Sequence, residues 1–386
     1  MKGNVLRYTI CRRLDDKGKQ AMSKFWNEWR ERDFDENYTW IYEGNPAGQA
    51  IVFLVRDNES TEYVGCCAIF PRKLSIDGID LRVGVVADPF VSKEHRCCAL
   101  FPRKFSVDSK DLRAGLPGGP LVSKEHRVMA PSAKLGNELI SIVQEDGIDL
   151  LYVFPNKKSE PFLKRAGFKY LGLNTRRSKV VRTSEQLQKR RFCKYFIRPV
   201  STLLDIALKL FAFETWYRFK GGFVCEEMSD FDVRFDDLWM RSKSRFRIVG
   251  KRSSELLRWK YVEQPDTEFK IYAIFNSNKA ELKGYIVYCM DESSIKIRDL
   301  VLPKDKATAR IFVSNFLRHV KKQPKSSIVL HFLENKEIVG FLKKFGFVKR
   351  PEDRAVYYYC TERLLKRFPV LKDSEAWLLT NFDMDN

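Results

Sequence analysis

The sequence has few histidines, no regular cysteine spacing and no long apolar run. Its 386 residues include only 4 histidines, and its 9 cysteines lack the Cys-x2-4-Cys spacing with matching histidines that zinc sites favour. It contains no apolar run of about 18 residues, and its first residues lack the apolar core of a signal peptide. These absences predict a cytoplasmic protein with no metal site and no membrane-spanning helix.

Basic residues, in contrast, are abundant. The chain carries 70 lysines and arginines against 50 acidic residues, a formal net charge of +20. Such a balance points to an anionic partner, which includes phosphates, nucleic acid, acidic lipid and nucleotide cofactors. With 44% apolar and 13% aromatic residues the chain can bury large cores, and its length favours two domains.

One segment of the sequence is duplicated. Residues 66–96 recur as residues 97–127, and about 20 of the 31 positions are identical. Both copies end in Lys-Glu-His-Arg, but only the second continues into a helix signal, with Pro131 at the first helical position and Gly147 to cap the end.

Beyond this repeat, the two halves of the chain match each other at longer range. WIYEGNP, which begins at Trp40, is matched by WKYVEQP, which begins at Trp259, and each tryptophan is followed at the same spacing by a glycine, Gly65 or Gly284. Each half also closes a helical stretch on Gly-Phe, at 167–168 and 346–347. Without one 31-residue copy the two spans have similar lengths, so the duplication is an insertion into the first half.

The pattern of elements predicts a mixed α/β fold with a mostly antiparallel sheet flanked by helices. For the first half we expect strands at 5–13, 50–56, 63–76, 111–123, 149–154 and 168–173, and helices at 15–31, 131–145 and 159–166. For the second half we expect strands at 270–275, 283–290, 295–301 and 327–332, and helices at 306–321 and 336–345.

The segment from Arg127 to the helix at Pro131 is the strongest candidate for a ligand site. A strand, a tight loop and a helix start would present free backbone N–H groups at a positive helix end, which suits phosphate. Arg127 adds a fixed charge, and the small residues Ala130 and Ser132 allow a ligand to approach the main chain.

Together with Asn156 and the Gly-Phe ending, this Arg-x-x-small-x-small loop resembles the GNAT superfamily of acyl-CoA-dependent N-acyltransferases. The resemblance covers about residues 5–173 and recurs faintly over 223–360. It implies two tandem GNAT-like domains, 1–173 and 223–386, joined by 174–222, with an acetyl-CoA or another acyl-CoA as co-substrate. The residues that it places against this acyl-CoA are Leu121, Val122, Arg127, Val128, Met129, Ala130, Pro131, Ser132 and Asn156.

The sequence departs from the family pattern in both halves. Many family members have a tyrosine that protonates the departing thiolate, but Leu163 and Leu342 stand at this position. A base that accepts the proton of the amine is still needed, and Glu125, Tyr152 and Tyr170 are weak candidates for it. The second half has no small-residue turn after residue 302, so we expect it to be a degenerate domain that shapes the substrate cleft.

Two placements of the repeat are open. In the favoured one, 66–76 is the third strand and 111–123 is the fourth, which connects directly to the loop at Arg127. In the other, residues 83–86 (VGVV) form the fourth strand, since they are a better β sequence than Leu116-Pro117-Gly118-Gly119-Pro120.

Residues 174–222 are expected to form a basic linker, 174–194, followed by an apolar helix over 200–219. This helix either packs between the domains or makes peripheral membrane contact through 190–219.

The sequence as a whole predicts an N-acyltransferase that moves an acetyl or short acyl group to a small-molecule or peptide amine. The net charge suits an anionic acceptor, and nucleic acid is possible but not favoured. The alternatives are a Fem-type peptidyltransferase that uses aminoacyl-tRNA and a non-catalytic GNAT-like binding protein.

Overall fold

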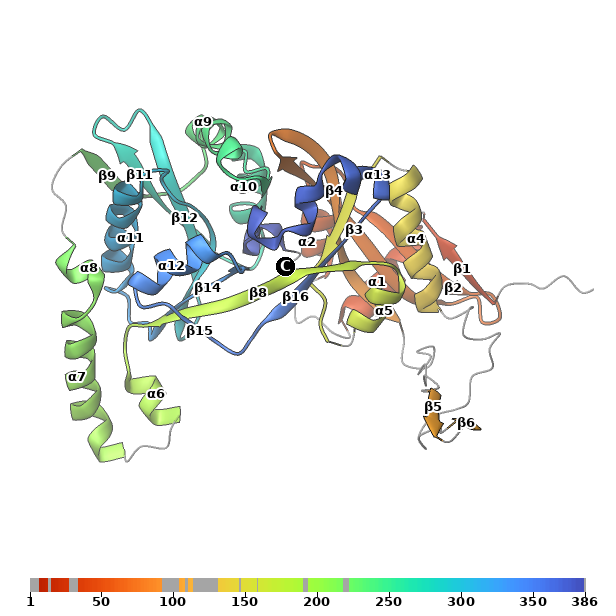
Figure 1. Ribbon diagram of the computed structural model, residues 1–386, viewed down its shortest axis with the longest axis horizontal. Coiled ribbons are helices and arrows are strands. Elements are labelled where there is room, and N and C mark those ends of the chain that lie inside the picture. The colour runs from red at the N-terminus through yellow and green to blue at the C-terminus, as the bar shows by residue number, and fades with distance from the viewer. Residues whose placement is uncertain are drawn as a thin grey trace, which may run out of the picture.

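The computed structural model describes most of the chain in ranges separated by gaps (Figure 1). These ranges are 7–12, 15–27, 34–91, 104–107, 110–113, 131–145, 147–157, 159–189, 194–217 and 222–384.

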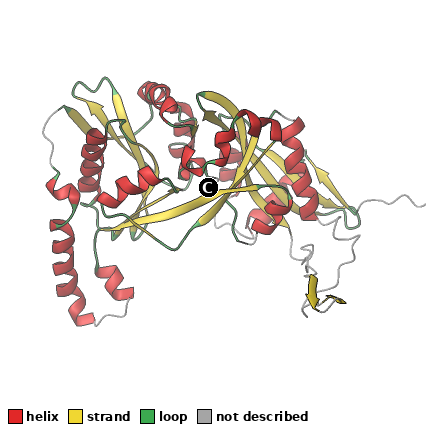
Figure 2. Ribbon diagram, viewed as in Figure 1, coloured by secondary structure: helices red, strands yellow, loops and turns green. Residues whose placement is uncertain are grey.

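One 15-stranded sheet runs through the whole molecule, and helices cover both of its faces (Figure 2). Its main path has the order β1-β2-β3-β4-β7-β16-β8-β14-β13-β12-β11-β9, with β10, β15 and β17 beside it. The strands are β1 Tyr8–Cys11, β2 Ile51–Asp57, β3 Tyr63–Ile76, β4 Ile79–Val91, β7 Leu150–Val153, β8 Lys169–Val180, β9 Phe223–Met228, β10 Ile248–Gly250, β11 Lys270–Asn276, β12 Leu282–Met290, β13 Ser294–Val301, β14 Ser327–Leu333, β15 Val348–Lys349, β16 Arg354–Cys360 and β17 Trp377–Leu378.

The helices lie on both sides of this sheet and at its two ends. The α-helices are α1 Asp16–Asn27, α2 Phe34–Tyr38, α4 Pro131–Glu145, α5 Glu160–Arg165, α6 Ser184–Lys189, α7 Lys194–Leu210, α8 Phe213–Trp216, α9 Val233–Ser242, α10 Ser254–Tyr261, α11 Lys306–Val320, α12 Lys336–Lys344 and α13 Glu362–Arg367. No helix in the described ranges is both long and apolar enough to cross a membrane.

Successive strand residues in the first half point alternately into two hydrophobic cores, one on each face of the sheet. Ile69 and Leu151 pack with α4 through Leu135, whereas Phe70 and Tyr152 belong to the core on the other face, which includes α1. This alternation follows from the two-residue period of a strand and explains why β3 and β4 are apolar on both faces.

The two halves repeat one topology and exchange a strand. Each has an antiparallel meander followed by a helix and a parallel strand: β2, β3, β4, α4 and β7 in the first half, and β11, β12, β13, α11 and β14 in the second. The next strand of each half crosses to the other: β8 pairs with β14, and β16 pairs with β7. The sheet is continuous because these two strands, which also pair with each other, lie at its centre (Figure 1).

The matched motifs at Trp40 and Trp259 meet between the halves. Their rings stack with centroids 5.4 Å apart. Trp40 Nε1 donates to the carbonyl of Trp259 at 2.8 Å, and Trp259 Nε1 donates to the carbonyl of Trp40 at 2.9 Å. This reciprocal contact, in which each residue makes the same bond to the other, is what a pseudo-twofold relation between the halves predicts.

The first copy of the repeat supplies both central strands, so the favoured placement of the repeat is wrong. β3 and β4 form one hairpin, and β4 pairs in parallel with β7 through Val83, Gly84 and Val85. The second placement is confirmed. Valines prefer the pleated central position, whereas Pro117 and Pro120 cannot donate to a strand ladder.

The second copy keeps the hairpin register of the first. Its described part is a separate two-stranded sheet, β5 Lys104–Val107 and β6 Lys110–Arg113. Lys104 pairs with Arg113 there, as Lys73 pairs with Arg82 in the main sheet, 31 residues earlier.

Residues 174–180, predicted here as the start of a basic linker, instead form the second part of β8. Asn174, Thr175, Arg177, Ser178 and Lys179 are all buried there. This basic segment can pair with β14 as a buried strand because its buried cations are in ion pairs. Arg177 pairs with Glu334 at 2.8 Å, and Lys179 pairs with Glu214 at 3.1 Å.

Candidate functional site

The candidate site in the first half is the place where β4 and β7 separate. Their parallel register ends at Val85 and Tyr152, and β4 continues to Val91 beyond the last pair. The backbone groups of β4 beyond Val85 are therefore not used in the β4–β7 ladder. The second half repeats the arrangement, because the β13–β14 register ends at Ile297 and Leu330 while β13 continues to Val301.

Two matched glycines allow the separating strand to lie close to its neighbour. A Cβ on Gly65 would lie 2.7 Å from the carbonyl oxygen of Phe90, and a Cβ on Gly284 would lie 2.6 Å from that of Val301. Both distances are too short for any side chain, so glycine is required at both positions. The pair also identifies Phe90 in β4 as the counterpart of Val301 in β13.

The two helices that follow these strands begin differently. In the second half, the Asp305 carboxylate caps α11 by accepting from Thr308 N at 2.7 Å and from Thr308 Oγ1 at 2.8 Å. These hydrogen bonds lower the pKa of Asp305 below its usual value. α4 begins at Pro131, and the preceding Ala130 has no side-chain acceptor. An alanine before α4 cannot supply the side-chain acceptor that Asp305 supplies to α11.

A basic cavity of about 590 Å³ lies at the corresponding place in the second half. It is formed by the end of β13, the start of α11, and α12. Its basic lining residues outnumber its acidic ones by seven to three, and they are Arg245, Arg247, Lys304, Lys306, Arg310, Lys336 and Lys344. Two of the acids are in ion pairs, Glu337 with Lys306 and Glu375 with Lys336. The sequence shows no phosphate loop here, because these cations come from three separate segments of the chain.

Most of the predicted acyl-CoA contacts lie outside the described residues, namely Leu121, Val122, Arg127, Val128, Met129 and Ala130, together with the candidate base Glu125. Pro131 is the first residue of α4 and Ser132 lies in its first turn, as expected. Because β4 comes from the first copy of the repeat, the strand positions assigned to Leu121 and Val122 are occupied in the sheet by Phe90 and Val91.

Asn156 forms a hydrogen-bonded turn just before α5. Its Oδ1 accepts from Ser159 N at 3.0 Å and from Ser159 Oγ at 3.1 Å, and Ser159 is the residue that precedes the helix. Asn335 is itself the N-cap of α12, where its Oδ1 accepts from Glu337 N at 3.0 Å and from Ile338 N at 3.2 Å. The motif asparagine thus sets the direction of the helix that follows the parallel strand in both halves.

The two tyrosine candidates for a base lie in different environments. Tyr152 is fully buried in β7, and its hydroxyl donates to the carbonyl of Asp383 at 3.0 Å, which ties it to the segment that ends the described chain. Tyr170 in β8 is 55% exposed and lies edge-on to Tyr357, with ring centroids 5.6 Å apart. Desolvation raises the pKa of Tyr170, which disfavours the phenolate that a base would need.

Leu163 and Leu342, which stand where the family places its acid, are buried in the two cores. A different hydroxyl lies close to the first of them. Tyr357 reaches this region from β16 of the second half, and its hydroxyl donates to Glu160 at 3.2 Å. Sequence reasoning missed Tyr357, because only the strand exchange brings residues of the second half beside α5.

A buried charge cluster ties together three segments of the second half. Arg252 donates to Asp299 at 3.1 Å and to Asp383 at 2.8 Å, and all three side chains are almost fully buried. Burial opposes the charge, but the two carboxylates still raise the pKa of Arg252 well above its usual value. Tyr285 donates to Asp299 at 2.7 Å. Removal of any member would leave a buried charge without its partner.

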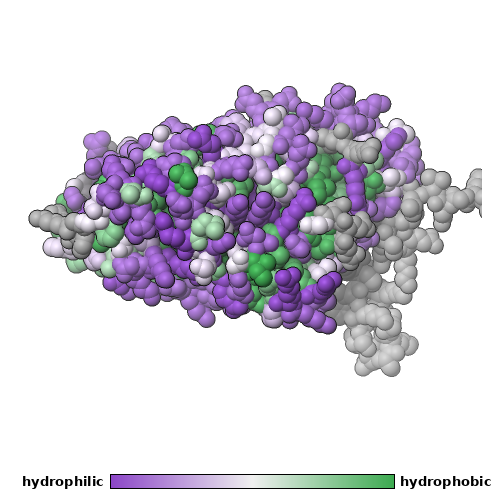
Figure 3. Space-filling view, turned by 90° about the horizontal axis from the view of Figure 1, so that it is seen from above, coloured by the Kyte–Doolittle hydropathy of each residue, from purple (hydrophilic) through white to green (hydrophobic). Residues whose placement is uncertain are grey.

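Seen from above, the described surface is mainly hydrophilic, and hydrophobic patches gather on the side of the first half (Figure 3). Among the described residues no group of three or more His, Cys, Asp or Glu side chains is placed to hold a metal ion.

No family model matches this sequence, and no curated protein matches it either. Solved structures do match over 92% of the chain. They include a GCN5-related N-acetyltransferase from Anabaena variabilis (12% identity, TM-score 0.60, 73% of that chain) and one from Kribbella flavida (10% identity, TM-score 0.54, 71%). N-myristoyltransferase from Saccharomyces cerevisiae with bound myristoyl-CoA also matches (12% identity, TM-score 0.53, 83% of that chain). The protein therefore has a GNAT-like fold.

Proposed function

We propose that the protein is an N-acyltransferase that moves an acetyl or other short acyl group from an acyl-CoA to a primary amine. The observation that carries this proposal is the opening between β4 and β7 in a GNAT-like fold, beside the start of α4. The similar N-acetyltransferases and the myristoyl-CoA-bound N-myristoyltransferase support it.

The pyrophosphate of the acyl-CoA would lie at the start of α4, against backbone N–H groups and Arg127. Its pantetheine arm would extend into the opening between β4 and β7, where a backbone N–H group of the strand would donate to the thioester carbonyl. A donor placed in this way is typically worth about 3 kcal/mol of transition-state stabilisation.

The reaction would proceed by direct attack of the neutral amine on the thioester carbonyl in a ternary complex. The C–N bond forms, the C–S bond breaks and CoA leaves as a thiolate. A thiol pKa of about 8.5 means that water can protonate this thiolate, so the leucine at position 163 is compatible with turnover. The proton lost by the amine would pass to a base, for which Glu125 and the Tyr357–Glu160 pair are candidates.

The acceptor would be a small molecule or a peptide amine that is anionic overall, in keeping with the net charge of +20. A panel of acyl-CoAs and amines, assayed for release of free thiol, tests the activity directly. Turnover with an amine supports the proposal. Tight CoA binding without turnover across the panel would favour a binding protein, and salt-sensitive tRNA retention without CoA binding would favour a Fem-type peptidyltransferase.

Calorimetric titration with CoA tests which residues form the phosphate site. Arg127→Ala should weaken CoA binding about tenfold or more, whereas the repeat counterpart Arg96→Ala should change it little, since only Arg127 lies just before α4. Arg310→Ala in the second-half cavity is the matched control. Equal losses for Arg127→Ala and Arg96→Ala would reject the assignment, and a larger loss for Arg310→Ala would move the CoA site to the second half.

A further inference from the structure

The segment of α7 and α8 exposes more apolar surface than any other described part of the molecule. Fourteen large hydrophobic side chains of the described residues are exposed, and eight of them lie between Tyr195 and Trp216. Leu203 is 69% exposed, Leu210 52% and Phe211 89%. Such a concentration marks an interaction surface, because scattered exposed residues are common but a continuous apolar patch is not.

The exposed residues of α7 follow the helical period. Tyr195, Pro199, Leu203, Ile206 and Leu210 are spaced by three or four residues, so they share one face of the 17-residue helix. This face points away from the body of the protein, since α7 packs on α6 and the pair extends from one end of the molecule (Figure 1). The linker helix expected to pack between the domains is instead a projecting helix with an apolar outer face.

Positive charge accompanies this face, and the acids of the segment are turned inward. Arg198 and Lys209 on α7 are exposed. Asp205 accepts from Thr183 N and Thr183 Oγ1, both at 2.8 Å, and Glu214 is buried, where it pairs with Lys179 at 3.1 Å. Asp205 is therefore hydrogen-bonded to Thr183, and Glu214 is in a buried ion pair. The exposed surface of the segment is apolar and cationic.

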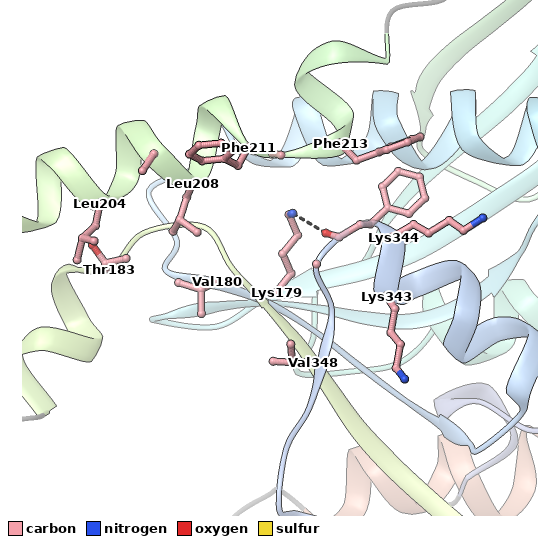
Figure 4. Close-up of a pocket in the computed structure, with 14 residues that line it drawn as sticks. Lys179, Val180, Thr183, Leu204, Leu208, Phe211, Phe213, Lys343, Lys344 and Val348 are labelled. Carbon is pink, nitrogen blue, oxygen red and sulfur yellow. Dashed lines mark hydrogen bonds between the residues drawn. The ribbon is translucent and has the colours of Figure 1, made fainter.

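The inner face of α7 lies over a hollow. An apolar groove of about 620 Å³ separates the helix from the end of α12 and from β8 (Figure 4). Leu204, Leu208 and Phe211 line it from the helix, and Lys343 and Lys344 lie at the end of α12 on the other side. The helix therefore presents apolar residues on two sides, and the neighbouring exposed groups are again lysines.

We propose that α7 and the following residues through Trp216 dock on an anionic lipid membrane, with the outer face of α7 in the interfacial region. A single surface that is apolar at its centre and cationic at its border matches a bilayer with anionic headgroups. Tyr195 and Trp216 are residue types that prefer the membrane–water interface. The proposal does not depend on the acyltransferase activity, and it is tested without an activity assay.

Co-sedimentation of the full-length protein with vesicles tests it. The protein should pellet with phosphatidylcholine–phosphatidylglycerol vesicles, less so at high salt, and little with phosphatidylcholine alone. Leu203→Glu together with Leu210→Glu should reduce partitioning about tenfold or more, because two charges enter the apolar face. Arg198→Gln with Lys209→Gln should reduce binding to the anionic vesicles about tenfold. Thermal unfolding of each variant checks that it is folded.

The matched control is Val233→Glu with Met240→Glu, which places the same charges on exposed apolar residues of α9. This pair should bind vesicles as the unmodified protein does. Three results would overturn the proposal: no binding of the unmodified protein to anionic vesicles, unchanged binding of the Leu203→Glu/Leu210→Glu variant, or an equal loss in the control. Light scattering could instead show that the unmodified protein is a dimer and that the Leu203→Glu/Leu210→Glu variant is a monomer. If the unmodified protein then also failed to bind vesicles, the face would be assigned to a second copy of the chain.

Discussion

The two halves are alike in topology and differ at the start of one helix. In the second half Asp305 caps α11, so a carboxylate already accepts the hydrogen bonds of that helix end. In the first half the residue before α4 is Ala130, whose side chain cannot act as such a cap. Yet the described basic cavity lies in the second half. A shared scaffold thus positions both helix starts, and a single residue before each helix determines whether a carboxylate is present that would compete with a phosphate.

The largest effect should come from deleting one or the other copy of the repeat, which only the first half has. Deletion of 97–127 keeps β3 and β4 and joins Arg96 to Val128, so unfolding in urea should change little. Deletion of 66–96 would put Pro117 at the position of Val86 in the central strand and should cost about 3 kcal/mol or more. Equal stability of the two deletion variants would contradict the placement of the first copy in the sheet.

The matched glycines test the equivalence of the halves. Gly65→Ala and Gly284→Ala should each destabilise by about 2 kcal/mol, because the new Cβ meets a backbone carbonyl. Gly340→Ala, in α12 with no neighbour within 4 Å of the new Cβ, is the control and should stabilise slightly. The measurement is the free energy of unfolding in urea. A loss of stability in only one of the two glycine variants would show that the halves are not equivalent at this position.

The residues four before Asn156 and Asn335 differ in chemical type. Tyr152 occupies this place in the first half and His331 in the second. Burial and the nearby Arg176 lower the pKa of His331 to about 4. Since an unfolded histidine has a pKa of about 6.5, the unfolded state binds the proton first, so stability should fall by about 2–3 kcal/mol as the pH falls from 6.5 to 4.

His331→Gln should remove that part of the pH dependence and leave stability at pH 7 or above nearly unchanged. The measurement is the free energy of unfolding of both proteins at several pH values, and their difference isolates the histidine from the carboxylates. Parallel curves would show that the ring keeps its ordinary pKa and is in contact with water.

The smallest effect concerns the helix starts themselves. Asp305→Ala should destabilise by about 1 kcal/mol through loss of the cap on α11. The reciprocal change, Ala130→Asp, should stabilise α4 by a similar amount and weaken CoA binding, because its carboxylate competes with the phosphate. Thermal unfolding and CoA titration of the pair check this, and unchanged CoA affinity in Ala130→Asp would place the diphosphate elsewhere.

Local patterns were sufficient to predict about half of the elements. The strand at 63–76 and the helix at 131–145 were predicted with the observed bounds, and the four strands and two helices predicted for the second half were placed within one residue at each end, whereas β9, α9, α10 and β16 were not predicted. Alternation and helical period report burial directly, so strongly patterned segments are readable from the sequence. The strand at 111–123 was wrong, because connection to Arg127 was given more weight than the β preference of the valines at 83–86.

The candidate site was less predictable than the fold. The Asn156 motif and the start of α4 were identified from the sequence, whereas Tyr357 and the basic cavity of the second half were not. Both depend on segments far apart in the chain. Tyr357 lies beside Glu160 only because β16 crosses to the first half, and no local pattern encodes which strand edge will be free.

The sequence by itself determined a tandem α/β protein with a duplicated hairpin, since composition, periodicity and internal repeats are properties of neighbouring residues. Only the tertiary structure decided which copy enters the sheet, that β8 and β16 exchange between halves, and that the outer face of α7 stays exposed. Those outcomes depend on competition between distant segments for the same hydrogen-bonding edge and the same apolar surface, which is settled by packing of the whole chain.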